Sequence, residues 1–495
     1  MPAQKVLIIG AGIAGIATAI RLAVKGFEVE VFEVNSYPGG KLTSIEQQGY
    51  RFDAGPSLFT MPQYVDELFR LAGKNPKDFF NYQKLEVICQ YFYEDGTRFT
   101  AYANEQKLAE EISAKTGGGA TQVNKYFKNS RQIYKITNHV FLERSLHRVK
   151  TYMRWDTLRS VFKLFKIDAM RTMHMANKSF FDDKRLVQYF DRYATYNGSN
   201  PYGAPATLNV IPHLEQEYGA WFPEGGMHSI TNSLVSLAGS LGVKFNYNSP
   251  VSEIVIEKKK AIGIQVNGSI VAGSIIISNM DVWFTYKKLL KNYPALKPKR
   301  ILNQERSSSA LIFYWGISKE FKELDLHNIF FSADYEDEFW HIWQEKNISD
   351  DATVYLNISS KYNAADAPAG HENWFVMINV PANTGQDWDA MIDKAREDIQ
   401  KKLARLLNED IAPLITSETI LDPRSIEGNT SSYQGSLYGN SSNGRFAAFL
   451  RHANRSSQFK NLYFCGGSVH PGGGIPLALL SAKIVSEWIS TPHNS

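Results

Sequence analysis

The chain has 495 residues, more than one hydrophobic core usually holds, so it predicts two or three structural domains. Its hydrophobic share of 43% is that of a globular protein, and its formal net charge of +4 is too small to indicate a nucleic-acid partner. Its two cysteines, Cys89 and Cys465, exclude a disulfide framework and a cysteine-rich metal site, so we expect a reducing compartment and no metal cofactor.

The N-terminal segment predicts neither a signal peptide nor a membrane anchor. An apolar strand pattern already begins at Val6, which leaves no room for a charged region followed by an apolar one. No stretch approaches the roughly 20 uncharged apolar residues that a membrane-spanning helix needs. We therefore expect a cytoplasmic protein.

Residues 5–33 follow the order strand, tight glycine turn, helix and second strand. Gly10, Gly12 and Gly15 form the pattern G-x-G-x-x-G. The first glycine permits the turn, the second lets the backbone approach a pyrophosphate, and the third allows close packing of helix on strand. The second strand ends at Glu33, where a carboxylate would hold the ribose hydroxyls of an adenosine. The segment predicts a dinucleotide site; the alternative is an accidental glycine-rich turn.

A second glycine-rich turn, Gly39-Gly40-Lys41, follows the second strand, and Gly55-Pro56-Ser57 comes after it. Two such turns with a basic residue favour a cofactor held along its length, FAD rather than NAD. The stretch resembles the GG-R-x-x-[ST] block of the flavin amine oxidase and phytoene desaturase superfamily, with Ser44 as its hydroxyl. Lys41 stands where arginine is commoner, which keeps the charge and loses the bidentate fork. The alternative for Lys41 is a solvated surface lysine.

The middle of the chain alternates between strand and helix patterns. Residues 86–103 predict two strands joined by a hairpin turn at Asp95-Gly96. Residues 105–195 are helical in character, and residues 300–420 carry further strands that we expect to form a sheet facing the substrate. The other predicted elements are helices at 62–73, 228–241 and 388–407 and strands at 243–247, 251–257, 261–266 and 269–277.

Residues 148–171 form a basic segment with aromatic side chains at helical spacing. Tyr152, Trp155 and Phe162 fall on one face, and the segment carries a local net charge of +5, from seven basic residues and two aspartates. Such a helix can lie in an anionic membrane interface. The alternative is an ordinary helix with one core face and one solvated face. A lipid-like substrate would favour the membrane interpretation.

Near the C-terminus the chain reads "NLYFCGGSVHPGGGIPLALL", and in the same superfamily this block returns to close the flavin site. Gly466 and Gly467 would reach the cofactor, and Gly474 would bring backbone N–H groups to its ring. Ile475 and Pro476 open the last helix, whose N-terminus carries roughly +0.5 charge. Aimed at the N1–C2=O edge of the flavin, that charge would stabilise the reduced anion. The alternative is a glycine-rich connection to a core helix.

Four stretches resemble the bacterial and fungal carotenoid desaturases of the phytoene desaturase type. They are "DAGPSLFTMP" (53–62), "RYATYNGSNPYGAPA" (192–206), "FPEGGM" (222–227) and the closing "GGSVHPGGGIP". The resemblance implies noncovalent FAD and an α/β fold with a discontinuous Rossmann-type FAD-binding domain, an interleaved α+β substrate domain and a helical, membrane-associated region. We place the FAD-binding domain at residues 1–84, 222–300 and 425–495, and the substrate domain at 85–221 and 301–424, with 105–195 mostly helical.

The resemblance also implies which residues contact FAD. Val251 opens the strand that passes the adenine in this superfamily. The expected cofactor-binding residues are Gly10, Gly12, Ile13, Ala14, Gly15, Glu33, Gly40, Lys41, Ser57, Leu58, Val251, Gly466, Gly467, Gly474 and Ile475.

The chemistry implied is removal of two hydrogens from a C–C single bond beside a polyene. Hydride transfer to flavin N5 would leave an allylic cation, and loss of a neighbouring proton would complete the double bond. No catalytic base is assigned: His213, His228 and His470 are candidates by residue type only. The terminal electron acceptor, oxygen or a quinone, stays open.

The divergence of the sequence within the family favours the subgroup that introduces a 3,4-double bond beside a 1-hydroxy group. The alternatives are a phytoene or neurosporene desaturase, an amine oxidase or retinol-saturase-like flavoenzyme, and a non-enzymatic lipid-binding flavoprotein. A carotenoid substrate and a membrane surface are the expected partners.

Overall fold

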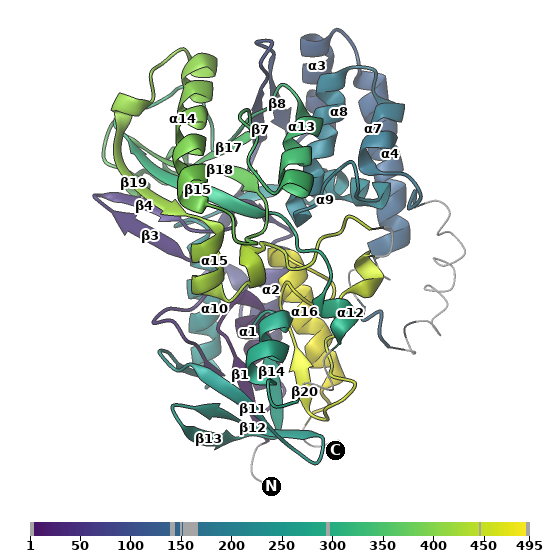
Figure 1. The fold of residues 1–495 in the computed structure, drawn as a ribbon, viewed down its shortest axis with the longest axis vertical. Coiled ribbons are helices and arrows are strands. Elements are labelled where there is room, and N and C mark those ends of the chain that lie inside the picture. Colours follow the sequence, from purple (N-terminus) through teal and green to yellow (C-terminus); the bar gives the residue numbers. More distant parts are fainter. Residues whose placement is uncertain are drawn as a thin grey trace.

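The computed structural model describes residues 4–138, 144–148, 151, 167–293, 298–444 and 447–491. The basic segment 148–171 lies for the most part outside these residues. Figure 1 shows a parallel sheet with its helices in the lower half of the molecule, with both chain ends marked near it, and a larger, mostly antiparallel sheet with its helices above. The two halves meet around a cavity.

A five-stranded parallel sheet forms the centre of the lower half (Figure 1). Its strand order is β10 (Lys244–Asn246), β2 (Glu28–Phe32), β1 (Lys5–Ile9), β14 (Ile275–Ser278) and β20 (Leu462–Phe464). Three distant stretches of the chain therefore share one sheet. Parallel strands buried on both faces read as continuous apolar runs, as "VLII" in β1 and "IIIS" in β14 do.

Side chains of β1 alternate between two cores, because successive residues of a strand point to opposite faces. Val6 and Ile8 pack against the helices α1 (Ile13–Val24), α2 (Gln63–Leu71), α10 (His228–Ser240) and α16 (Ile475–Trp488). Leu7 and Ile9 pack on the other face, against β11 (Val251–Glu257) and β12 (Lys260–Val266), which form an antiparallel sheet with β13 (Ser269–Ala272). The parallel sheet is therefore covered on both faces.

The prediction of one strand over 269–277 was wrong, since β13 and β14 are separate strands in different sheets. The chain turns between them at Gly273, where an added Cβ would lie 2.7 Å from Cγ of Leu7. A larger residue would have to displace the buried side chain of Leu7, and the turn carries the chain from the antiparallel sheet into the parallel one.

The upper half is built on a seven-stranded sheet (Figure 1). Its order is β19 (Ile415–Leu421), β15 (Ser309–Ile317), β18 (Glu372–Val380), β17 (Val354–Ile358), β16 (His327–Phe330), β7 (Val87–Phe92) and β8 (Arg98–Tyr102). All of its pairs are antiparallel except β16 with β7. Leu311 and Phe313 point toward α14 (Trp388–Leu407), while Ala310 and Ile312 point into the cavity.

Helices complete the upper half and two small sheets join it to the lower one. The helices beside β7 and β8 are α3 (Glu105–Thr116), α4 (Ala120–Thr137), α7 (Met173–Phe180), α8 (Lys184–Asp191), α9 (Val210–Tyr218) and α13 (Tyr335–Trp340). The small sheets are β3 (Ser44–Gln47) with β4 (Tyr50–Asp53), and β5 (Phe59–Thr60), β9 (Ala220–Pro223) and β6 (Tyr82–Lys84). The short helices are α11 (Val282–Phe284), α12 (Lys299–Leu302) and α15 (Pro423–Thr430).

Several predicted elements are confirmed. The strand pair around Asp95-Gly96 is β7 and β8, and Gly96 has the positive φ (82°) that the turn needs. The predicted helix at 388–407 is α14, residue for residue. It begins after Asp387, whose side chain accepts the N–H of Ala390, and it ends at Asn408, which has left-handed φ and ψ.

Candidate active site

A cavity of about 980 Å³ lies between the carboxyl ends of the parallel strands and the seven-stranded sheet. In open α/β sheets ligands bind at this edge. All of the expected cofactor residues except Gly15 line it: Gly10, Gly12, Ile13, Ala14, Glu33, Gly40, Lys41, Ser57, Leu58, Val251, Gly466, Gly467, Gly474 and Ile475. Residues that are up to about 460 positions apart are thus brought to one site.

Gly15 has the role in helix packing that its motif predicts. A Cβ at this position would lie 2.3 Å from the carbonyl oxygen of Gly10, so any side chain would push α1 away from β1. Gly10 makes the turn with a φ of 96°, and Gly12 is the N-cap of α1. The first N–H groups of a helix have no acceptor within the helix. In α1 these groups include those of Ile13 and Ala14, and both residues line the cavity. This arrangement suits a pyrophosphate.

Glu33 follows β2 and touches the same turn. One carboxylate oxygen accepts the N–H of Ala11 at 2.7 Å, and the other accepts the N–H of Asn35 at 3.0 Å. The side chain is 6% exposed and lines the cavity. An ionised carboxylate has about four acceptor sites, so it keeps capacity for ribose hydroxyls.

Lys41 is partly buried in the cavity wall. Its Nζ donates to the carbonyl oxygens of Ser436 at 3.0 Å and Leu437 at 2.8 Å. Burial lowers the pKa of its ammonium group to about 8, although the carboxylate of Asp281 opposes the shift. The alternative of a solvated surface lysine is therefore wrong. The backbone at Gly55 packs closely on that of Lys41, because a Cβ on Gly55 would lie 1.7 Å from the carbonyl oxygen of Lys41.

The C-terminal glycines let three pieces of backbone meet at the start of α16. A Cβ on Gly467 would lie 3.2 Å from Cα of Gly473, and a Cβ on Gly473 would lie 2.8 Å from Cα of Tyr438. Gly474, the N-cap, has φ 98° and ψ 152°, a conformation that is essentially restricted to glycine. Ile475 begins the helix at the cavity wall, so the positive end of α16 faces the cavity.

Asn279 is a site residue that the motifs did not single out. It follows β14, and its amide lies beneath both glycine motifs: a Cβ on Gly12 would be 2.7 Å from its Oδ1, and one on Gly466 would be 2.8 Å from its Nδ2. Its Nδ2 also donates to the carbonyl oxygen of Cys465 at 3.1 Å. The polar residue at the carboxyl end of a buried strand was the signal that could have identified it.

Cys465 is 1% exposed and does not line the cavity. Burial raises the pKa of its thiol to about 12, so it is not a reactive thiolate at neutral pH. This environment agrees with the expectation of a noncovalently held flavin.

Two of the three candidate histidines lie away from the cavity wall. His213 packs against Tyr134, with ring centroids 5.2 Å apart. His470 is 1% exposed, and its Nε2 donates to the carbonyl oxygen of Arg144 at 2.8 Å. Burial lowers the pKa of both rings, that of His470 to about 4. His470 therefore packs its loop and does not face the substrate side.

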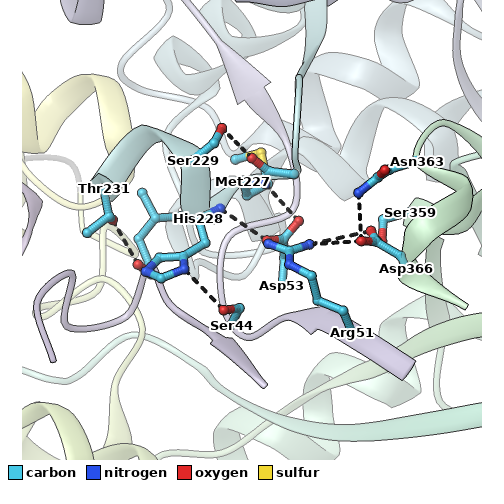
Figure 2. A network of polar contacts seen from close by, with 12 residues as sticks. Ser44, Arg51, Asp53, Met227, His228, Ser229, Thr231, Ser359, Asn363 and Asp366 are labelled. Carbon is cyan, nitrogen blue, oxygen red and sulfur yellow. Dashed lines mark hydrogen bonds and ion pairs between the residues drawn. The ribbon is translucent and has the colours of Figure 1, made fainter. Parts of the chain in front are cut away.

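His228 is the one of the three that lines the cavity. Its Nδ1 lies 3.1 Å from Oγ of Ser44, as Figure 2 shows, so the hydroxyl predicted from the glycine-lysine block meets this ring. Burial, with the nearby positive charge of Arg51, lowers the pKa of the ring, which keeps it neutral at pH 7.

The same close-up shows an ion-pair network that joins the two halves (Figure 2). Asp53 of β4 accepts the N–H groups of Met227 at 2.7 Å and His228 at 3.0 Å and so caps α10. Arg51 pairs with Asp53 at 2.8 Å and with Asp366 of the upper half at 3.3 Å. The network fixes the position of His228 relative to the seven-stranded sheet.

The remainder of the cavity is mostly apolar. Many of the side chains in this part come from the segment 208–214 and from β15 and β18 of the seven-stranded sheet. They include Leu208, Ile211, Leu214, Ala310, Ile312, Phe375 and Met377. Such a wall suits a hydrophobic ligand beside the nucleotide site.

One polar cluster interrupts this wall, and the sequence motifs assigned no role to it. Nη2 of Arg192 lies 3.6 Å from Oε1 of Glu215, and both residues are less than 5% exposed. His327 of β16 and Tyr355 of β17 line the cavity nearby, joined by a hydrogen bond of 2.7 Å. Arg192 lies in the resembled stretch 192–206, which was its signal; His327 and Tyr355 carried none.

No helix of the described residues has the length and apolar character needed to cross a membrane. The same residues contain no group of three or more His, Cys, Asp or Glu side chains placed to hold a metal ion.

Comparison with known proteins places this architecture. The family model described as flavin-containing amine oxidoreductase matches residues 13–489. The chain is 49% identical over 486 residues to a 1-hydroxycarotenoid 3,4-desaturase of Flavobacterium sp. (strain P99-3), covering 98% of this chain and 99% of the relative. It is 33% identical to a 4,4'-diapolycopene oxygenase of Methylomonas sp., covering 98% of each.

Among solved structures, an oxidoreductase of Methanosarcina mazei superposes with a TM-score of 0.65 at 17% identity, covering 98% of this chain and 100% of the other. That likeness supports the fold. The sequence matches, the glycine cradle and the cavity support FAD as the cofactor. The chain belongs to the flavin-containing amine oxidoreductases, as an FAD-dependent oxidoreductase in the carotenoid desaturase branch that its motifs resemble.

Proposed function

We propose that the protein is a carotenoid desaturase that introduces a 3,4-double bond next to a 1-hydroxy end group. The observation that carries the proposal is the 49% identity, over 98% of the chain, to an enzyme named for that reaction. The cavity supports it, because a mostly apolar wall adjoins the expected cofactor residues.

The reaction removes a hydride and a proton from adjacent carbons of the end group. When bound, FAD supplies the hydride acceptor. The C–H carbon has no neighbouring carbonyl, so a carbanion is not stabilised, whereas a cation beside the polyene is delocalised. The main task of the protein is therefore to position the substrate carbons and to exclude water.

The chain supplies the cofactor environment with backbone groups. The expected FAD contacts are the glycine turns, Glu33, Lys41, Val251 and the start of α16, all of which line the cavity. The positive end of α16 favours negative charge on a group bound there. We assign no catalytic base; His228 lines the cavity but its Nδ1 is bonded to Ser44.

The proposed substrate is a water-insoluble polyene, so we propose that the enzyme takes it up at a membrane surface. The basis is the sequence of residues 148–171, with its basic residues and aromatic spacing. Reversing the charges of Arg159, Lys163 and Lys166 to glutamate should release the protein from anionic vesicles in a sedimentation assay. Unchanged binding by the triple variant would refute this segment as the anchor.

Turnover of the purified holoenzyme tests the proposed reaction. With a 1-hydroxycarotenoid, the product should have lost two hydrogens and absorb at longer wavelength, and the bound flavin should bleach without oxygen. Re-oxidation by oxygen or by a quinone then identifies the electron acceptor.

A product that has gained oxygen would indicate an oxygenase, and lycopene from phytoene would indicate a phytoene desaturase. Bleaching by an amine would indicate an amine oxidase, and no bleaching by any carotenoid would favour a non-enzymatic binding protein.

A further inference from the structure

His327 lines the cavity and carries a buried ring nitrogen without a hydrogen-bond partner among the described residues. The side chain is 3% exposed and belongs to the cavity wall. Its Nδ1 has two partners, the hydroxyl of Tyr355 at 2.7 Å and Nδ2 of Asn357 at 3.1 Å. Its Nε2 has no hydrogen-bond partner among the described residues. A buried polar atom without a partner at a ligand cavity indicates a group that the ligand satisfies.

The neighbours of His327 determine which nitrogen carries the proton. Nδ2 of Asn357 donates one hydrogen to the carbonyl oxygen of Leu326 at 3.0 Å, which fixes the orientation of the amide. Its other hydrogen points to Nδ1 of His327, so Nδ1 is an acceptor and the proton resides on Nε2. Burial lowers the pKa of the ring to about 3, with help from the positive charge of Arg192. His327 is therefore a neutral donor.

Arg192 also lines the cavity, and its guanidinium group lies over the rings of four tyrosines, 4.2–5.7 Å from their centroids: Tyr91, Tyr189, Tyr193 and Tyr196. Its Nη1 donates to the hydroxyl of Tyr196 at 3.0 Å, whereas Nε and Nη2 have no hydrogen-bond partner within the described part of the chain. Glu215 lies 3.6 Å away and balances its charge, while accepting hydrogen bonds from Tyr193 at 2.6 Å and Tyr196 at 2.5 Å. A neutral hydroxyl suits this part of the wall better than an anion, because Glu215 already neutralises the guanidinium.

The position of this cluster suits the substrate end. The hydroxyl oxygen of Tyr355 lies 2.7 Å from Nδ1 of His327 and 2.7 Å from Oγ of Ser57, so two hydrogen bonds link His327 to Ser57. Ser57 is an expected cofactor contact, two residues after the glycine that touches Lys41. In a 1-hydroxy end group, C3 is separated from the hydroxylated C1 by one carbon. A group that binds the hydroxyl must therefore lie close to the cofactor, and Tyr355 links His327 to Ser57, an expected cofactor contact.

We propose that His327, through its Nε2–H, binds the 1-hydroxyl oxygen of the substrate and makes the enzyme specific for hydroxylated ends. The proposal rests on the proposed function and deepens it. Without a hydroxyl in this place, Nε2 of His327 stays desolvated and unpaired, so an end group that lacks the hydroxyl is rejected.

The test compares two substrates that differ only in the 1-hydroxyl group, using the holoenzyme and its His327→Phe and His327→Gln variants. His327→Phe should lower kcat/KM for the hydroxylated carotenoid about 10- to 100-fold. For the substrate without the hydroxyl group, kcat/KM should stay the same or rise. His327→Gln keeps an N–H donor and should recover part of the preference. Dissociation constants of the two carotenoids, measured by quenching of flavin fluorescence, should change in the same sense.

Controls separate binding from structure. His452 is also buried, at 5% exposed, but it does not line the cavity, so His452→Phe should leave the ratio of the two kcat/KM values unchanged. If His327→Phe lowers kcat/KM equally for both substrates, the histidine is structural and the proposal is overturned. If the wild-type enzyme does not desaturate the hydroxylated substrate at all, the proposed function itself fails, which is a different result.

Discussion

The carboxylate of Glu33 accepts the backbone N–H of Ala11 at 2.7 Å, so the acid at the end of β2 is held against the glycine turn that follows β1. The sequence separation of 22 residues is closed by the parallel pairing of the two strands. The contact places a negative group at the adenosine end of the expected FAD site while it also completes the turn. Glu33 therefore serves the fold, and we propose that it also holds the ribose of FAD.

Replacing Glu33 with alanine should weaken FAD binding by about 10- to 100-fold, because hydrogen bonds from ribose hydroxyls to a charged acceptor contribute about 1.5–3 kcal/mol. Titration of the apoprotein with FAD, followed by flavin fluorescence, measures the change. Glu28→Ala is the matched control, because Glu28 is exposed on the same strand and does not line the cavity. Equal FAD affinity in the two variants would contradict the role of Glu33.

Lys41 should make FAD affinity depend on pH. Burial lowers the pKa of its ammonium group to about 8 in the ligand-free protein, so the positive charge is present below pH 8 and is lost as the pH rises through it. A bound pyrophosphate favours the charged form, and the dissociation constant for FAD should therefore rise between pH 7 and pH 9.5. Fluorescence titrations across this range measure it.

The matched variant for this experiment is Lys41→Met, which keeps most of the side-chain volume without the charge. It should bind FAD more weakly at pH 7 and lose most of the rise between pH 7 and pH 9.5. A pH profile of the variant parallel to that of the wild type would assign the dependence to another group.

Gly226 provides a test of the network around Arg51 and Asp53. A Cβ at Gly226 would lie 2.6 Å from Nη1 of Arg51 and 2.7 Å from Oδ2 of Asp53, and the residue also has a positive φ of 83°. Gly225 has a similar φ of 77°, but its Cβ would meet nothing closer than 3.9 Å. Both alanine variants carry backbone strain, and only Gly226→Ala also displaces the ion pair.

Gly226→Ala should therefore lower the free energy of unfolding by about 1–3 kcal/mol more than Gly225→Ala does. Urea denaturation followed by tryptophan fluorescence gives the comparison. Equal midpoints for the two variants would show that the network moves without cost and does not hold α10 in place.

The nucleotide half was predictable because its signals are local. The turn at Gly10, the packing at Gly15 and the acid at Glu33 lie within one strand–helix–strand unit, and each is required by a contact at short sequence separation. The C-terminal glycines were found through their resemblance to a family block, and the structure places Gly474 at the start of α16 by the cavity.

His327 and Tyr355 of the polar cluster were not predictable because no local pattern marks them. His327 reaches the wall through the parallel pairing of β16 with β7, two strands more than 200 residues apart in the sequence. Arg192 comes from a different helical segment, and nothing in its own stretch indicates that Glu215 lies beside it. The break at Gly273 was missed for a related reason, since only the contact with Leu7 of β1 requires it.

Buried neutral histidines should make the fold sensitive to acid. Burial lowers the pKa of His470 to about 4, whereas the ring has a pKa near 6.5 when unfolded, so the unfolded state binds more protons as the pH falls below about 6.5. The stability that the neutral ring retains at pH 8 is lost progressively toward pH 4. By linkage, the loss amounts to about 2 kcal/mol at pH 5.

His470→Gln keeps a donor for the carbonyl oxygen of Arg144 and does not titrate, so it should lose about that much less stability than the wild type between pH 8 and pH 5 in urea denaturation. A His470→Gln profile that falls as steeply as the wild type would show that this ring is already protonated in the folded protein.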